Sequence, residues 1–311
     1  MFNNSNSLSK VESTTVRVER LGIESLLRRL DIELNIIFGD SIDLTKKDII
    51  FSADWGFCRY YRLNTGEILI ENCDGKCGVK IDPQARHLSV WSNKKIGQSE
   101  DRELWHQLIH YGVAADLSDC GYTPIHAAAV VAPNGDSWLI GGQTHSGKST
   151  LVLGLIEAGW QFLGDDGLIL AEEEGEIVAH AWLGTSLLDP ILVETYPQLQ
   201  SKLGDLVGDR RLIDLHSCYP HQWLAKTQPK GLLFPRFSPN TAIAELVPIS
   251  TGMALGNLMS HGAMCLMERP QPHLLHLQKL TNRSQHFDLL LGSALQTKPY
   301  LVANILRSIS N

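Results

Sequence analysis

The eight-residue segment Gly142–Ser149, framed by glycines, constrains the fold of this chain more than any other feature. It fits the pattern G-x-x-x-x-G-K-[ST], in which the glycines let the backbone curl until successive N–H groups point inward. Lys148 adds a positive charge, and the Ser149 hydroxyl can ligate Mg²⁺. These groups suit the β- and γ-phosphates of a nucleoside triphosphate. The sequence therefore predicts a site for ATP and Mg²⁺ at this loop.

The residues on either side of the loop support this interpretation. A chain of this length matches the pattern by chance about once in a hundred, so the context matters. Here a predicted strand, Ser137–Gly141, leads into the loop, and a predicted helix follows over residues 148–158. We expect His145 to point outward. The residues expected to bind the nucleotide are Gly142, Gln143, Thr144, His145, Ser146, Gly147, Lys148, Ser149 and Thr150.

Two consecutive carboxylates follow the next predicted strand, Trp160–Gly164. Strand, loop, helix and strand in this order predict a right-handed crossover, and ligands of such a unit lie at the carboxyl ends of its strands. Asp165 and Asp166 fall at that end. One of them can hold Mg²⁺ while the other accepts a proton from an incoming hydroxyl group. The alternative is a surface turn, because Asp-Asp-Gly is also common turn chemistry.

A histidine at the start of the preceding predicted strand is a further candidate. Residues 125–132 and Ser137–Gly141 are apolar runs that predict a hairpin. If Asn134-Gly135 is a two-residue turn, the residue numbers of each pair across the hairpin add up to 269. His126 then lies opposite Gln143. We therefore expect His126 beside the γ-phosphate. The alternative is a packed histidine at a strand end.

The remaining patterns predict two further regions and a tail. Residues 1–10 are polar and predict a disordered tail. Residues 11–120 carry short alternating runs, a helix around Ile23–Leu30 and a second helix that Ser99 can cap, which predicts a β-rich α+β region. We expect this region to recognise the substrate, and residues 121–311 to form the catalytic domain. Within that domain, residues 203–215 are ambiguous.

The C-terminal third contains three further predicted elements. Gly231–Phe234 predicts a strand and Gly252–Met259 a helix. Phe287–Ile309 predicts a helix that breaks before Pro299. Together with the loop, these elements predict an α/β fold.

Composition excludes several classes of function. The formal net charge is −7, which argues against nucleic-acid binding, because neutralising phosphates needs a basic face. No run of 18 apolar residues and no signal peptide is present, so we expect a cytoplasmic protein without a membrane partner. The six cysteines are too scattered for a disulfide scaffold. We expect Cys73 and Cys77 to be reduced thiols in a hairpin. The alternative is that the two thiols form half of a metal site.

The segments 125–127, Gly142–Thr150 and 164–166 together resemble the catalytic domain of HPr kinase/phosphorylase. The segment Gly231–Phe237 and the region after it are similar to the HPr-kinase-related kinases of peptide-modification and other biosynthetic clusters. The resemblance implies a P-loop kinase core of the HPr-kinase/PEP-carboxykinase-like type with a mixed sheet. It covers roughly residues 120–300.

The resemblance also implies roles for individual residues. Lys148 would bind phosphates, Ser149 and Asp166 would hold Mg²⁺, Asp165 would be the general base, and His126 would lie at the γ-phosphate. The family has a glutamate where this chain has Thr150, which removes a carboxylate from the surroundings of the metal. Its phosphorylase signature is not recognisable here, which argues against HPr as the substrate and against the reverse reaction.

Four cations of the C-terminal half, Arg210, Arg211, Lys230 and Arg236, have no role implied by the motifs. One of them can offset transition-state charge as an arginine finger does. Arg236, between a proline and an aromatic residue, is the best candidate for this catalytic role.

These observations predict an ATP-dependent kinase that phosphorylates a hydroxyl group, either a serine of a peptide or protein or a serine-like small molecule. The expected partners are therefore a nucleotide and a hydroxyl-bearing acceptor, and a homo-oligomer is possible. Two alternatives remain open. One is a nucleotide-dependent switch or hydrolase without an acceptor, and the other is a regulatory module that binds nucleotide without chemistry.

Overall fold

The computed structural model describes residues 33–38, 48–54, 58–75, 77–85, 87–92, 102–143, 145–182, 185–207, 209–261, 270–296 and 298–307. The chain divides into two compact units, Met1–Asp116 and Leu117–Asn311. The tail predicted over residues 1–10 and the helix predicted around Ile23–Leu30 lie outside the described residues. Within the described ranges, no helix has the length and apolar character needed to cross a bilayer.

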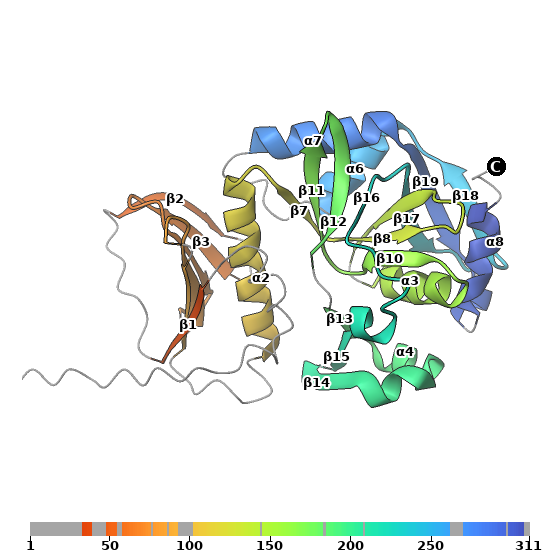
Figure 1. Cartoon of the computed structure of the whole chain (residues 1–311), viewed down its shortest axis with the longest axis horizontal. Helices are drawn as coiled ribbons and strands as arrows, with labels where there is room; N and C mark the ends of the chain where they lie inside the picture. Colours follow the sequence, from red (N-terminus) through yellow and green to blue (C-terminus); the bar gives the residue numbers. More distant parts are fainter. Residues whose placement is uncertain are drawn as a thin grey trace, which may run out of the picture. The chain divides into compact units, whose positions relative to one another are not determined.

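The first unit contains a six-stranded sheet in the order β1-β6-β5-β4-β3-β2 (Figure 1). All neighbouring strands are antiparallel except β1 and β6, which are parallel. The β-rich N-terminal region predicted from alternating runs is therefore confirmed. Its elements are β1 (Glu33–Phe38), β2 (Ile49–Asp54), β3 (Cys58–Leu63), β4 (Ile68–Asn72), β5 (Cys77–Asp82), β6 (His87–Ser92) and α2 (Arg102–Asp119).

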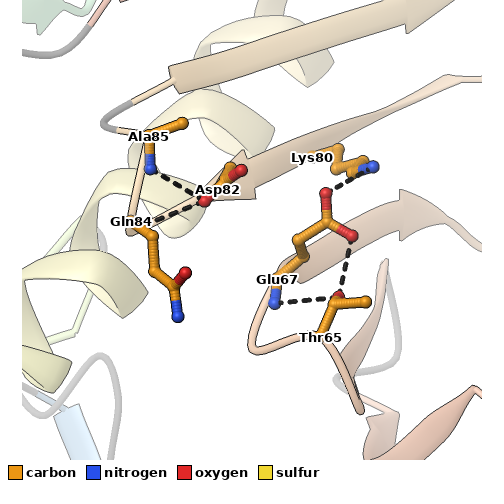
Figure 2. Close-up of polar contacts among 6 residues, drawn as sticks. All are labelled: Thr65, Glu67, Lys80, Asp82, Gln84 and Ala85. Carbon is orange, nitrogen blue, oxygen red and sulfur yellow. Dashed lines mark hydrogen bonds and ion pairs between the residues drawn. The ribbon is translucent and has the colours of Figure 1, made fainter.

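Short-range polar contacts hold the turns of this sheet (Figure 2). Thr65 Oγ1 donates a hydrogen bond of 2.8 Å to Glu67 Oε2 at the β3–β4 turn, and Lys80 Nζ lies 2.6 Å from Glu67 Oε1. After β5, Asp82 Oδ1 accepts two backbone hydrogen bonds of 2.9 Å each from the turn that follows. Side chains that bond the backbone of their own turn stabilise that turn, so they help to fix the register of the hairpins.

The central sheet of the second unit is mixed, with the order β10-β8-β9-β17-β19-β18. β9, β17 and β19 are parallel neighbours, while β8 is antiparallel to both β9 and β10. β10 therefore runs in the same direction as β9, with β8 between them, and α3 connects the two. The strands are β8 (Ala127–Val131), β9 (Ser137–Gly141), β10 (Gln161–Gly164), β17 (Gly231–Phe237), β18 (Ala244–Pro248) and β19 (Gln285–Leu291), and α3 is Lys148–Glu157.

β8 and β9 are buried on both faces, which explains why these two strands are continuous apolar runs. Ala128 and Val130 pack into one hydrophobic cluster with α3 and α8. Ala127 and Ala129 face the opposite cluster, which includes Leu258 of α6, Leu277 of α7 and residues of the hairpin Leu168–Ala181. Helices therefore cover both faces, as Figure 1 shows. The helices are α6 (Thr251–His261), α7 (Pro270–Arg283) and α8 (Val302–Arg307), with 3-10 turns at Ser293–Gln296 and Pro299–Leu301.

Two smaller sheets complete the second unit. One has the order β16-β12-β11-β7, and the other has the order β13-β15-β14. The ambiguous segment 203–215 forms β14, β15 and the start of a short helix. The expected mixed α/β fold is confirmed. The remaining elements are β7 (Thr123–Ile125), β11 (Leu168–Glu173), β12 (Glu176–Ala181), β13 (Thr185–Leu188), α4 (Pro190–Thr195), a 3-10 helix (Pro197–Lys202), β14 (Leu203–Val207), β15 (Arg210–Asp214), α5 (Leu215–Cys218) and β16 (Lys226–Thr227).

The predicted register of the β8–β9 hairpin is wrong by one residue. Val131 pairs with Ser137, so paired positions sum to 268 rather than 269. The reason is the turn: Ala132 N donates to Asp136 O at 2.8 Å, so three residues form the loop instead of two. Gly135 takes the left-handed conformation, with φ 87°, that a three-residue hairpin loop requires at this position.

The helix predicted over Phe287–Ile309 is also wrong. The first part of that segment belongs to β19, which lies between β17 and β18 in the central sheet, and only Val302–Arg307 is α-helical. The leucines at the end of β19 are consecutive and show no period-two alternation, so periodicity alone does not separate this short run from a helix. The partners β17 and β18 decide the conformation, and their pairing is not visible in the local sequence.

The pairing of Gly231 on β17 with Trp138 on β9 predicts a strong packing effect at this glycine. A Cβ atom there would lie 2.1 Å from the ring of Trp138, which is 3% exposed, so the buried ring would have to shift. We expect Gly231→Ala to lower the free energy of unfolding by about 1–3 kcal/mol in urea denaturation. The control is Gly252→Ala in α6, where a Cβ meets nothing within 4 Å, and which should be neutral or slightly stabilising. Equal effects of the two substitutions would contradict this packing.

Candidate active site

The loop between β9 and α3 has the backbone conformation that the sequence pattern requires. Gly142 and Gly147 have φ angles of 152° and 98°, in the region that favours glycine. A Cβ on Gly142 would also lie 2.7 Å from Ser146 Oγ. Gly147 is the N-cap of α3, and no side chain caps this end of the helix. The backbone N–H groups at the helix start are therefore available to an anion. Thr144 lies outside the described residues.

Lys148 is the first residue of α3 and folds back over the loop. Its Nζ donates hydrogen bonds to the carbonyl oxygens of Gly142, at 2.9 Å, and Gln143, at 3.0 Å. The residue is 6% exposed. Burial lowers the pKa of Lys148, and the charges of Asp166 and Asp165 oppose that shift. A buried ammonium group whose hydrogen bonds go to neutral carbonyls favours an anionic ligand beside it.

Asp165 follows directly after β10 and is 2% exposed. Ser186 Oγ, from β13, donates a hydrogen bond to Asp165 Oδ1. The second oxygen, Oδ2, is buried and has no hydrogen-bond partner among the described residues. Burial, and next the charge of Asp166, raise the pKa of Asp165 to about 6, while the hydroxyls of Ser186 and Ser149 and the charge of Lys148 oppose this shift. Asp165 is therefore a carboxylate that is ionised at neutral pH and has an unused buried oxygen.

His126 and Asp166 form a polar pair at the mouth of the same site. His126 lies in the bend between β7 and β8, and its Nε2 is 2.8 Å from Asp166 Oδ1. Because of the corrected register, His126 continues the hairpin opposite Gly142 rather than Gln143. The expectation that it approaches the loop does not depend on this shift, because its side chain lines the same pocket as Lys148. His126 is thus a pocket residue, paired with a carboxylate.

One pocket brings most of the predicted residues together. The residues that line it come from the loop, from the acidic turn after β10, and from the β13–α4 and β15 segments. They are His126, His145, Gly147, Lys148, Ser149, Thr150, Asp165, Asp166, Leu187, Asp189, Leu192 and Arg210. His145 has φ 64°, and its side chain is 72% exposed, with Nδ1 3.9 Å from Asp189 Oδ2. His145 therefore lies on the outer rim.

Arg236 does not join this pocket. It lies at the end of β17, with Nη2 3.4 Å from Asp288 Oδ1, and it lines a second pocket together with Gly142, Gln143 and Ser146. The arginine that lines the pocket of Asp165 is Arg210, at the start of β15.

Two residues at the site are not singled out by the sequence: Arg210 is one of four candidate cations, of which Arg236 is preferred, and Ser186 has no predicted role. Arg210 belongs to the segment 203–215, whose pattern is ambiguous, so nothing in the sequence brings it to the loop. Ser186 is a lone serine twenty-one residues after Asp165, and only the fold shows that the two side chains meet.

The donor set fits a magnesium ion that arrives with a nucleotide. Among the described residues, no group of three His, Cys, Asp or Glu side chains could hold a metal on its own. The Asp166 carboxylate and the Ser149 hydroxyl line the same pocket as Lys148, beside the unpartnered buried oxygen of Asp165. Mg²⁺ is commonly bound by one or two carboxylates together with phosphate oxygens and water, so a set of this size suits it.

Comparisons with solved structures give matches, while comparisons of the sequence give none. No protein-family model matches the sequence, and no curated protein matches it. The structure is similar to an Hpr(Ser) kinase/phosphatase from Coxiella burnetii, with 14% sequence identity and a TM-score of 0.36. The match covers 60% of this chain and 90% of that chain. The resemblance to HPr kinases that the sequence motifs indicate is thus accompanied by a structural match, while the function proposed for this chain rests on its own residues.

The buried charge of Asp165 should reduce the stability of the fold at neutral pH. Folding raises the pKa of Asp165, so its ionisation destabilises the folded protein as the pH rises. This loss of stability is absent below the unfolded-state pKa near 4 and complete above about pH 6. We expect Asp165→Asn to gain up to about 3 kcal/mol of stability at pH 7.5, because about two pKa units are at stake. Thermal unfolding should show a higher Tm for the variant at pH 7.5 and little difference at pH 4. A variant that is less stable at both pH values would contradict this assignment.

Proposed function

We propose that this chain is an ATP-dependent phosphotransferase that transfers the γ-phosphoryl group of ATP to a hydroxyl group. The observation that carries the proposal is the buried Asp165 carboxylate, which has a free oxygen and lines the same pocket as Lys148 and Ser149 of the loop. A phosphate-binding loop alone also suits a switch or a transporter component. A desolvated carboxylate beside it suits a group that receives the proton of an attacking hydroxyl.

The loop and the start of α3 bind the phosphates. Backbone N–H groups at the N-terminus of α3 and the ammonium group of Lys148 face anionic oxygens, and the site is partly closed to water. To bind phosphate, Lys148 Nζ exchanges at least one of its two carbonyl partners for a phosphate oxygen. Ser149 and Asp166 would hold Mg²⁺, which supplies charge neutralisation on the phosphates when it is bound, and the free oxygen of Asp165 stays available to the acceptor hydroxyl.

Asp165 accepts the proton of the acceptor hydroxyl. A general base works best when its pKa lies close to the working pH, and the environment of Asp165 raises its pKa to about 6. Ser186 fixes the orientation of this carboxylate through its other oxygen. His126 fixes Asp166, and the guanidinium group of Arg210 lines the pocket where it can offset charge on the transferred phosphoryl group.

The proposal extends to the acceptor, to the roles of the two regions of the chain and to the part of the cell in which the protein acts. The acceptor is a serine of a peptide or protein, or a serine-like small molecule, and the N-terminal region 11–120 recognises it. The catalytic domain comprises residues 121–311, and the protein acts in the cytoplasm. The open rim formed by His145 and Asp189 leaves space for an acceptor to approach the buried carboxylate.

Two substitutions separate nucleotide binding from transfer. Lys148→Ala should weaken the binding of Mg·ATP at least tenfold in calorimetry, because it removes a buried positive charge. Asp165→Asn should leave this affinity within a few fold but reduce phosphoryl transfer by about 10²–10⁴-fold. Transfer is measured with labelled ATP and a panel of peptides and metabolites, read by mass for the gain of one phosphate.

The control is Lys230→Ala. Lys230 is 65% exposed and forms an ion pair with Asp136 beside the β8–β9 turn, at the opposite edge of the sheet from the loop, so both readouts should stay unchanged. Full transfer by Asp165→Asn would contradict the assigned role of that residue. ATP hydrolysis that no hydroxyl compound in the panel accelerates would instead favour a hydrolase or switch.

A further inference from the structure

A second pocket, of about 410 Å³, lies against the same loop. The loop residues that line it differ from those that line the pocket of Asp165, and its other walls come from β17 and α6. The residues are Gly142, Gln143, Ser146, Phe234, Pro235, Arg236 and Asn257. None of the acidic residues of the first pocket reaches it.

The order of the strands places the two pockets on opposite flanks of the loop. β9 leads into the loop, and β8 and β10, which carry His126 and Asp165 at their loop ends, lie on one side of β9. β17, which carries Phe234 and Arg236, is the neighbour of β9 on the other side. The phosphate loop is therefore the wall between an acidic pocket and the second pocket.

The direction of transfer decides what the second pocket holds. In phosphoryl transfer the attacking and leaving oxygens lie roughly in line on opposite sides of the phosphorus atom. The acceptor must approach from the side of its base, Asp165. The leaving group, the rest of the nucleotide, must then extend away from Asp165 and past the loop. The second pocket lies in that direction.

From this arrangement we propose that the second pocket binds the base and ribose of the donor nucleotide, an inference that rests on the phosphotransferase function proposed above. Its volume lies within the range of small-molecule sites, about 300–1,000 Å³. Phe234 and Pro235 supply apolar surface, and the partly exposed guanidinium group of Arg236 is held by Asp288 and can stack on a planar ring.

Two polar atoms support a ligand in this pocket. Asn257 Nδ2 and Ser146 Oγ are both buried, and neither has a hydrogen-bond partner among the described residues. Buried polar groups without a partner cost stability, so a ligand that satisfies them gains affinity. The amide of Asn257 suits the ring nitrogens or exocyclic groups at the edge of a purine, and the hydroxyl of Ser146 suits a ribose hydroxyl or the phosphate next to it.

Calorimetry on the full-length chain tests this assignment, with Mg·ATP and Mg·tripolyphosphate as ligands. Asn257→Ala and Arg236→Ala should each weaken Mg·ATP about tenfold and leave Mg·tripolyphosphate unchanged, because the variants alter only contacts to the nucleoside. The control is Met253→Ala, one turn earlier on α6, which is 52% exposed and does not line the pocket. It should match the wild type with both ligands.

Photolabelling with Mg·8-azido-ATP maps the base directly. The expected labelled peptides contain residues 231–237 or Thr251–His261, and excess ATP should suppress the labelling. Labelling of residues 185–192 or 210–214 instead, together with unchanged affinities of the two variants, would overturn the nucleoside assignment but leave the proposed function standing. A wild-type protein that binds neither ATP nor tripolyphosphate would overturn the proposed function, and this inference with it. Variants that weaken both ligands equally would point to damage of the loop and would also overturn the assignment.

Discussion

Burial of two opposite charges at one edge of the central sheet is the constraint on which the site depends. Lys148 is 6% exposed and Asp165 is 2% exposed, so each gives up most of its hydration on folding. Their attraction repays only part of this cost: the pKa of Asp165 is raised and that of Lys148 is lowered, and burial is the first cause of both shifts. A phosphate would give Lys148 an anionic partner, and an acceptor hydroxyl would give the free oxygen of Asp165 a hydrogen-bond donor. The apo fold thus gives up stability for a site that a charged ligand completes.

The mixed sheet makes this arrangement possible. Because β9, β10, β17 and β19 run in one direction, their carboxyl ends meet at the same edge. The loop leaves β9 there, and the acidic turn leaves β10 two positions away, with β8 between them. The antiparallel hairpin β8–β9 brings His126 to that edge as well. The directions of these strands therefore set the positions of the cation, the carboxylates and the histidine. β17 lies on the other side of β9, next to the opposite flank of the loop.

Local patterns and topological rules were enough to predict the loop, the acidic turn after β10 and the position of His126 near both. These features depend on residues that are close in sequence or on the general direction of a crossover. The errors arise where distant pairing decides. The hairpin register depends on the closing bond from Ala132 to Asp136, and β19 is a strand only because β17 and β18 lie beside it. The same reason explains why the sequence gives Ser186 no role and prefers Arg236 to Arg210, because Ser186 and Arg210 come from a separate small sheet.

The central claim is that the loop and the acidic turn face the same triphosphate. Hydrogen–deuterium exchange of the full-length chain, with and without Mg·ATP, tests this claim most directly, because backbone N–H groups that bind phosphate exchange more slowly. The account predicts increased protection in peptides that cover Gly142–Leu151 and 164–168, and no change in the distant hairpin Leu168–Ala181 beyond its first residue. Unchanged exchange in the loop at saturating Mg·ATP, or protection of the loop without any change at Asp165 and Asp166, would contradict it.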